Sequence, residues 1–444
     1  MSEAIQHYLD QHAALKGSLP GNELTWLSAS REQALQEFSK QGFPHHRLED
    51  WKYTSIRPIE KRQFKLAETT DHTVDAASLS HYLCKDMACH LMVFVDGRFS
   101  APLSNLGTLP DGVKIKDITT ALKEDTELVQ THLGSAADIS RNGFAAMNMA
   151  FMSDGVFVEL HKNTKVELPI HLMFLSSGKQ EEVTSQARIL ILAGQGSQAK
   201  IIESYQALGN SVYFNNITTE IKLAANANIE HYKVQQESNK AFHIATLQVD
   251  QQRDSTFTSH SVSLGAQLAR NDINSWMGDE GATCNLNGLY VTEGRQHCDF
   301  HTRIDHAMPH CTSNEFYKGI LDGHSRAVFN GQVHVHPNAQ KSDAQQSNKN
   351  LLLSKDAEVD TKPQLEIYAD DVTASHGATV GQLDQNMMFY LRSRGIDYNA
   401  AHALLVYGFA RSVIEKMSLE PLQKHLEMAL VNRIPNAGQF SDMV

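Results

Sequence analysis

The sequence predicts a mainly β protein, with a parallel β-solenoid core at residues 151–382 between an N-terminal helical and mixed region (1–150) and a C-terminal helical segment (383–444). Two observations predict the solenoid. Between about 157 and 383 the chain consists of short β-branched or aromatic runs broken by Gly, Asn and Asp, without a helical period. Similar turn-then-strand units recur roughly 30 residues apart, with one wider gap, at Gly196, Ala227, Asp254, Gly281, His324 and Ala357. The alternative, a β-sandwich or jelly roll, requires hairpin turns of two to five residues between strands.

Helical signals dominate both ends of the chain. Ser30 and Gln33 have the spacing of a capping box, so a helix is expected to begin there and to stop at Gly42. Further elements of the N-terminal region are expected as strands at 91–95 and 113–118 and a helix at 121–133. After Leu383 the pattern predicts three short amphipathic helices, the third with Pro421 in its first turn.

Composition excludes several classes of partner. The 444 residues carry a formal net charge of −12, which would repel a phosphate backbone. The N-terminus has no basic segment followed by an apolar one, and no apolar run approaches the 18 or so residues of a membrane span. The five cysteines are odd in number and scattered, as in a reducing compartment. We therefore expect a cytoplasmic protein that binds neither nucleic acid nor membrane.

Two glycine motifs could suggest nucleotide binding. The run Gly194-x-Gly196-x-x-Ala199 follows a strand, but no strand–helix–strand alternation accompanies it, so we interpret it as a solenoid corner. The Gly-Lys pair at 178–179 lacks the upstream glycine and the following Ser or Thr of a P-loop. The sequence predicts no nucleotide site.

The cysteine spacing does not match that of a permanently bound iron-sulfur cluster. Cys84 and Cys89 have the C-x₄-C spacing that begins a plant-type ferredoxin motif, but Met92 occupies the position of the third ligand. We expect no cofactor on the isolated chain.

Histidines supply two candidate metal sites. The stretch from 297 to 311 is the densest set of potential ligands, and a rival hypothesis is a β-helix metalloenzyme that activates water with His297, His301, His306 and His310. Its two cysteines lack zinc-site spacing, and alternation along a strand turns some of its side chains inward, so ordinary strand and corner residues remain the alternative. In 333–336, Val alternates with His, so His334 and His336 should share the outer face, as metal ligands or as solvated side chains.

Several longer stretches carry a family resemblance. They are LEDWKYT at 48–54, NMAFMSDG at 148–155, FNG at 329–331, QQSNKNLLL at 345–353, KPQLEIYADDV at 362–372, SHGAT at 375–379 and FYLRSRGI at 389–396. Together they resemble the SufB/SufD family of the SUF iron-sulfur cluster assembly system, most closely its SufD members. The resemblance covers nearly the whole chain.

The resemblance implies a right-handed parallel β-helix and a non-catalytic scaffold subunit of a SufBCD complex. It implies pairing with a SufB-like paralogue through the C-terminal strands, and docking of a SufC-like ATPase on the C-terminal helices. On this basis the residues expected to face the ATPase are Phe389, Tyr390, Arg392, Arg394 and Gly395. A homodimer is the alternative for the chain alone, because the same edge strand could pair with a second copy.

The resemblance also assigns a role to one histidine. In the family a nascent, transient iron-sulfur cluster is thought to form at the interface, with the histidine of the S-H-G-A-T motif as a ligand, which is His376 here. Many relatives have a cysteine two positions earlier, where this chain has Ala374. The alternatives are that His376 only caps a turn beside Gly377 and that the chain is a purely structural adaptor. Flavin binding by the complex, and the choice among iron entry, sulfur transfer and cluster release, stay open.

Overall fold

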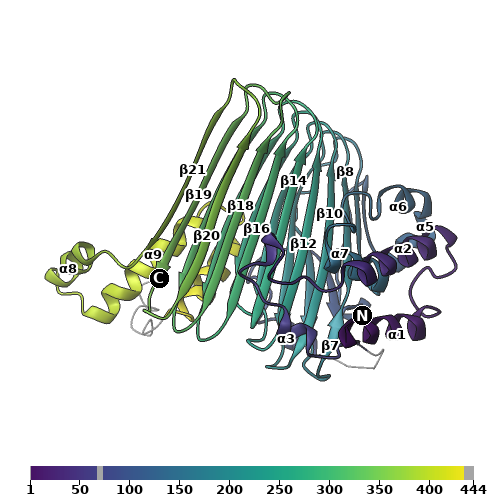
Figure 1. Ribbon diagram of the computed structural model, residues 1–444, viewed down its shortest axis with the longest axis horizontal. Coiled ribbons are helices and arrows are strands. Elements are labelled where there is room, and N and C mark those ends of the chain that lie inside the picture. Colours follow the sequence, from purple (N-terminus) through teal and green to yellow (C-terminus); the bar gives the residue numbers. More distant parts are fainter. Residues whose placement is uncertain (1, 68–73, 435–444) are drawn as a thin grey trace.

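The computed structural model describes residues 2–67 and 74–434 and confirms the mainly β, parallel solenoid architecture (Figure 1). Two sheets face each other, and the chain alternates between them. Sheet A contains β4 (Val113–Asp117), β5 (Asp154–Leu160), β8 (Ala187–Ala193), β10 (Tyr213–Leu223), β12 (Phe242–Gln251), β14 (Leu268–Met277), β16 (His297–His306), β18 (Arg326–Val335) and β20 (Glu358–Ile367), with β1 (Lys65–Leu66) and β7 (Val183–Ser185) beside them. Sheet B contains β3 (Arg98–Phe99), β2 (His90–Val95), β6 (Ile170–Ser176), β9 (Gln198–Ala207), β11 (Asn228–Gln236), β13 (Thr256–Ser263), β15 (Thr283–Thr292), β17 (Thr312–Leu321), β19 (Asp343–Leu352) and β21 (Thr373–Gly381).

Strands stack in parallel from coil to coil, and one coil takes about 30 residues. The glycine motif after β8 forms a corner, as expected. Gly196 has φ +68°, and a Cβ there would lie 2.5 Å from Oδ1 of Asn163, so the corner requires glycine. Each coil can therefore turn tightly while its strands keep register with those of the next.

Alternating side chains fill the space between the sheets. Inward-facing rings stack from coil to coil, with centroids 4.9 Å apart for Phe94 and Phe174 and 5.1 Å apart for Phe174 and Tyr205. Val333 and Val335 are fully buried, and the histidines between and after them point outward, which confirms the predicted alternation. The inside of the solenoid is the main core of the protein.

Most N-terminal helices pack on the outer face of sheet A, at the end of the solenoid remote from β21, whereas α4 (Ala76–Leu79) and η2 (Ala101–Leu103) lie against β2 of sheet B (Figure 1). The other helices of this region are α1 (Glu3–Leu15), α2 (Thr25–Gln41), η1 (Glu49–Trp51), α3 (Arg57–Glu60), α5 (Ile118–Glu124), α6 (Thr126–His132) and α7 (Gly143–Phe151). The predicted capping box is wrong, because α2 begins five residues before Ser30, whose hydroxyl donates back to the carbonyl of Trp26 within the helix at 3.0 Å. The predicted stop is confirmed, since Gly42 follows α2 with φ +66°.

Three helices close the described chain: α8 (Gln385–Ser393), α9 (Tyr398–Ile414) and α10 (Glu420–Val431). Asp384 and Asp397 cap the first two, and Pro421 lies in the first turn of the third, as predicted. The last two pack on the outer face of sheet B, whereas α8 projects from the solenoid (Figure 1). Residues 435–444 of the predicted segment lie outside the described residues. No helix in the described ranges is long and apolar enough to cross a membrane.

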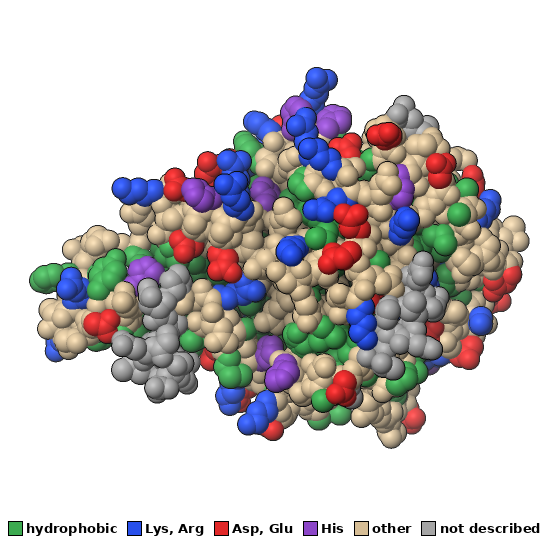
Figure 2. All heavy atoms as spheres, turned by 90° about the horizontal axis from the view of Figure 1, so that it is seen from below, with side chains coloured by type: hydrophobic (Ala, Val, Ile, Leu, Met, Phe, Trp, Pro, Cys, Tyr) green, Lys and Arg blue, Asp and Glu red, His purple; other side chains and the backbone are tan. Residues whose placement is uncertain are grey.

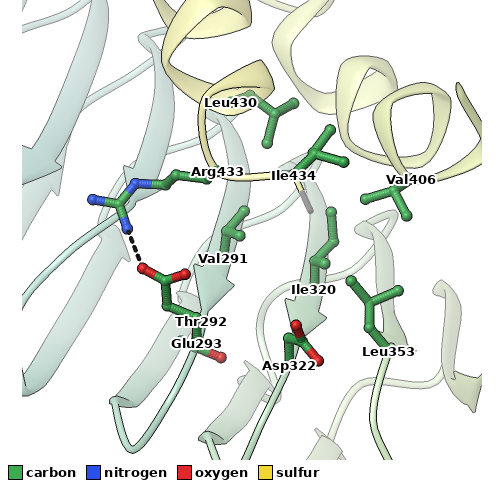
Figure 3. A pocket seen from close by; sticks show the side chains of 10 residues that line it. All are labelled: Val291, Thr292, Glu293, Ile320, Asp322, Leu353, Val406, Leu430, Arg433 and Ile434. Atoms are coloured by element: carbon green, nitrogen blue, oxygen red, sulfur yellow. Dashed lines mark ion pairs between the residues drawn. The ribbon is translucent and has the colours of Figure 1, made fainter. Parts of the chain in front are cut away.

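A small cavity lies between sheet B and the helices α9 and α10, and apolar side chains form most of its lining (Figure 3). An ion pair between Arg433 and Glu293, at 3.7 Å, closes one side of the cavity. Its space of about 20 Å³ has room for little more than a water molecule. It is a packing gap beneath the helices and not a substrate site.

Candidate functional site

The last coil of the solenoid is open. Within the described part of the chain, β20 and β21 each pair with a single strand, which leaves one edge of each strand with unpaired backbone groups. Inward positions that are buried elsewhere become accessible here, as Val380 shows with 48% exposure. Tyr368, at the corner between β20 and β21, is also exposed. An uncovered hydrophobic edge of this kind is typical of a site for strand pairing with another chain.

His376 lies in the mouth of this open end. It stands on β21 opposite Gln346 of β19, which in turn stands opposite Glu315 of β17. Residues opposite each other in a parallel sheet share a face, and Gln346 and Glu315 are buried inside the solenoid, so His376 is on the inward face. With no further coil above it, the imidazole is exposed.

A polar row leads inward from His376. The Gln346 side-chain amide donates to the Glu315 carboxyl group, and burial raises the pKa of Glu315 to about 7. The last coil itself contains no cysteine. The open end thus presents an exposed imidazole, and a buried acid with a raised pKa lies two strands further inside.

The cysteines of the chain are free thiols. Burial raises the pKa of Cys84, Cys284 and Cys298 to about 12, so all three are protonated at neutral pH. Burial therefore disfavours the nucleophilic thiolate form of these three side chains.

The surface of α8 presents a second cluster, next to the open end. Phe389 is 75% exposed, and Met387 and Tyr390 are also exposed. Figure 2 shows hydrophobic side chains at this tip of the molecule. Arg394 lies over the Tyr390 ring at 5.2 Å, and Gly395 ends the helix with φ +88°. Aromatic and arginine side chains exposed together are typical of interaction surfaces.

The four histidines of the rival metalloenzyme hypothesis do not converge. His297 and His301 point outward from β16, whereas His306 points inward and its Nε2 lies 2.8 Å from the hydroxyl oxygen of Ser313. His310 occupies an exposed corner. The only group of three potential ligands found among the described residues excludes all four of these histidines. The predicted site is therefore wrong as a single metal centre, because alternation along β16 separates its members.

The LEDWKYT stretch anchors the N-terminal region to sheet A, a role that no pattern in the sequence indicates. Its Thr54 hydroxyl donates to Asp299 of β16 at 2.5 Å, and Arg270 of β14 lies 3.7 Å from the centre of the Trp51 ring. Burial would raise the pKa of Asp299, but the charges of His301 and Arg270 hold it well below its usual range. Much of the polar character of this histidine-rich strand thus serves attachment of the N-terminal region.

Comparison with known proteins agrees with this architecture. Residues 174–409 match the family described as the SufBD core domain of SUF-system FeS cluster assembly, and residues 2–172 match the SufBD protein N-terminal region. An iron-sulfur cluster assembly SufBD family protein of Synechocystis sp. is 34% identical over 419 residues, covering 92% of each chain. The iron-sulfur cluster assembly protein SufD of Escherichia coli is 32% identical over 421 residues, covering 94% of this chain and 95% of its own. SufD of Bacillus subtilis is 26% identical over 437 residues, or 96% and 98% of the two chains. The fold, the two family matches and these full-length similarities place the chain in the SufB/SufD family of iron-sulfur cluster assembly proteins.

Proposed function

We propose that this chain is a non-catalytic scaffold subunit that pairs with a SufB-like paralogue at its open end and holds a nascent iron-sulfur cluster there, with a SufC-like ATPase bound at its C-terminal helices. The observation that carries this proposal is the open last coil, which combines unpaired strand edges, accessible inward-facing apolar side chains and an exposed imidazole. A second solenoid docked on these edges would continue both sheets and cover the apolar side chains.

The chemistry of the open end suits a cluster that is assembled and passed on. His376 supplies an imidazole, and the chain supplies no thiolate nearby, so a paralogue would contribute the sulfur ligands. A cluster held by ligands from two chains is released when the interface opens, because neither chain alone completes the coordination.

The path from the helices to the cluster site is short. Only residues 382–384 separate β21, which carries His376, from α8. We propose that nucleotide-driven movement of an ATPase bound at Phe389, Tyr390, Arg392, Arg394 and Gly395 displaces α8 and thereby strains the edge strand. The chain needs no nucleotide site of its own for this role.

Complex formation tests the pairing surface. Co-expression with the paralogue and the ATPase, followed by size-exclusion chromatography, should give a complex with the wild-type chain. Val380→Arg places a charge in the open end and should abolish co-elution of the paralogue, whereas Leu168→Arg, at a remote position with 42% exposure, should not. In the same experiment Phe389→Ala should selectively reduce recovery of the ATPase. Equal recovery of the paralogue with both arginine variants would reject the open end as the interface.

His376→Ala tests the ligand role. The variant should still form the complex, because the His376 side chain is exposed and does not contribute to the core. Cluster reconstitution, in contrast, should fall by at least about tenfold. His376→Cys should restore part of the cluster absorption, since thiolate also binds iron. The control His324→Ala removes another exposed histidine and should leave reconstitution unchanged. If His376→Ala assembles clusters normally, the chain is a structural adaptor only.

A further inference from the structure

A row of side chains crosses the outer face of sheet A near the ends of its strands. Asp305 of β16 stands opposite His334 of β18, which stands opposite Glu366 of β20. His336 follows β18 directly, and its imidazole lies against that of His334, with centroids 4.3 Å apart. Parallel register thus gathers two imidazoles and two carboxylates that come from three coils.

The distances within this row match a metal centre. One ligand atom each from Asp305, His334 and His336 lies within 4.8 Å of the other two. Nε2 of His336 is 3.0 Å from Oδ1 of Asp305, and Nδ1 of His334 is 3.1 Å from Oε2 of Glu366. Ligand bonds of about 2.0–2.2 Å to a first-row ion separate neighbouring ligand atoms by about 3–3.5 Å.

Surrounding groups hold the carboxylates in place. Arg303 pairs with Asp305 through two hydrogen bonds of 2.7 and 2.9 Å, and the Gln332 amide donates to Oε1 of Glu366 at 2.8 Å. The Trp276 ring packs edge-on against His336 at 5.2 Å. Partners of this kind orient ligands and tune affinity. Arg303 also donates to Oδ1 of Asp305, the oxygen nearest His336. When an ion binds this oxygen, Arg303 would have to give up that hydrogen bond and keep the one to Oδ2.

We propose that Asp305, His334 and His336 bind one divalent first-row transition metal ion, with Glu366 orienting the His334 ring through its hydrogen bond to Nδ1. Two imidazoles with a carboxylate favour Zn²⁺, Co²⁺ and Fe²⁺ and do not favour Mg²⁺ or Ca²⁺, which prefer all-oxygen sites. The site faces outward from sheet A, whereas His376 stands on sheet B and faces the inside of the solenoid. Metal binding here does not depend on the proposed function, whereas a physiological role as a ferrous iron site rests on it.

The test uses the full chain alone, so failure to form a complex with partners leaves its result unaffected. Anaerobic calorimetric titrations with Zn²⁺, Co²⁺ and Fe²⁺ should each give one ion per chain, and bound Co²⁺ should show visible bands of a nitrogen and oxygen ligand set. His334→Ala and His336→Ala should each weaken binding by at least about 10–100-fold.

The matched control is His324→Ala. His324 is also an exposed histidine beside a carboxylate, 3.8 Å from Asp356, but it belongs to no described three-ligand group. This variant should bind the ions as the wild type does. Undiminished binding in both His334→Ala and His336→Ala, or no binding of the three ions to the wild type at micromolar concentration, would overturn the proposal.

Discussion

Replacing Arg188 by Met is expected to lower the free energy of unfolding by about 3–5 kcal/mol. The guanidinium group is fully buried and donates to one carboxylate oxygen of Glu220 at 2.7 and 3.0 Å, and to the Asn148 side-chain oxygen at 3.0 Å. Met fills similar space but leaves the Glu220 carboxylate without its cation.

Glu220 joins the solenoid to the N-terminal region. It accepts hydrogen bonds from the backbone N–H groups of Gly134, Ala136 and Ala137. Burial alone would raise the pKa of Glu220, but Arg188 and the backbone N–H groups of Ala136 and Gly134 lower it. Loss of the cation should therefore loosen the loop that contains the three donors as well as the pair itself.

Urea unfolding measures the effect. Arg253→Met, which breaks an exposed pair with Glu280, should shift the midpoint little. The double variant Arg188→Met/Glu220→Gln should be more stable than Arg188→Met, because it removes the uncompensated charge. A single variant as stable as the exposed control would show that the buried pair does not stabilise the fold.

Glu315→Gln is expected to change how stability depends on pH. Burial raises the pKa of Glu315 from 4.5 to about 7, so the folded protein favours the protonated acid. A raised carboxyl pKa contributes stability that is present below pH 4.5 and is lost as pH rises through about 7. At about 1.4 kcal/mol per pH unit, the full loss is about 3 kcal/mol.

The amide of Gln is a neutral analogue of the protonated acid, so the variant should be more stable than the wild type at pH 8 and similar at pH 4.5. Free energies of unfolding across this range give the comparison. Glu167→Gln, at a position with 76% side-chain exposure, should leave the pH profile unaltered. If Glu315→Gln keeps the wild-type loss of stability between pH 5 and 8, another group causes that loss.

The repeating unit could be predicted from the sequence, and the reason for its one irregular interval could not. The turns at Gly196, Ala227, Asp254 and Gly281 precede strands of sheet B, whereas those at His324 and Ala357 precede strands of sheet A. The wider gap between Gly281 and His324 therefore marks a switch from one corner of the coil to the other. Local turn chemistry is the same at both corners, so sequence alone does not distinguish them.

The sequence predicts which side chains of one strand share a face, but not which residues of neighbouring strands stand opposite each other. Alternation along β16 already implies that His301 and His306 face opposite ways, and the metalloenzyme hypothesis failed on that point. The row that joins Asp305, His334 and Glu366 depends on the lengths of the intervening corners, which differ from coil to coil. The roles expected for His376 and the α8 residues came from family resemblance and stay predictions.

The two ends of the solenoid differ in a way that limits self-association. At the far end, the short strands β3 and β4 run antiparallel to their neighbours. The N-terminal helices gather at the same end of the solenoid (Figure 1). Among the described residues, the end with β20 and β21 is where both sheets end in a long strand with a free parallel edge. If pairing occurs at this end, as proposed, we expect excess chain without a partner to join end to end with one other copy and not to polymerise into a fibre, so that an imbalance in subunit supply yields discrete dimers that can exchange.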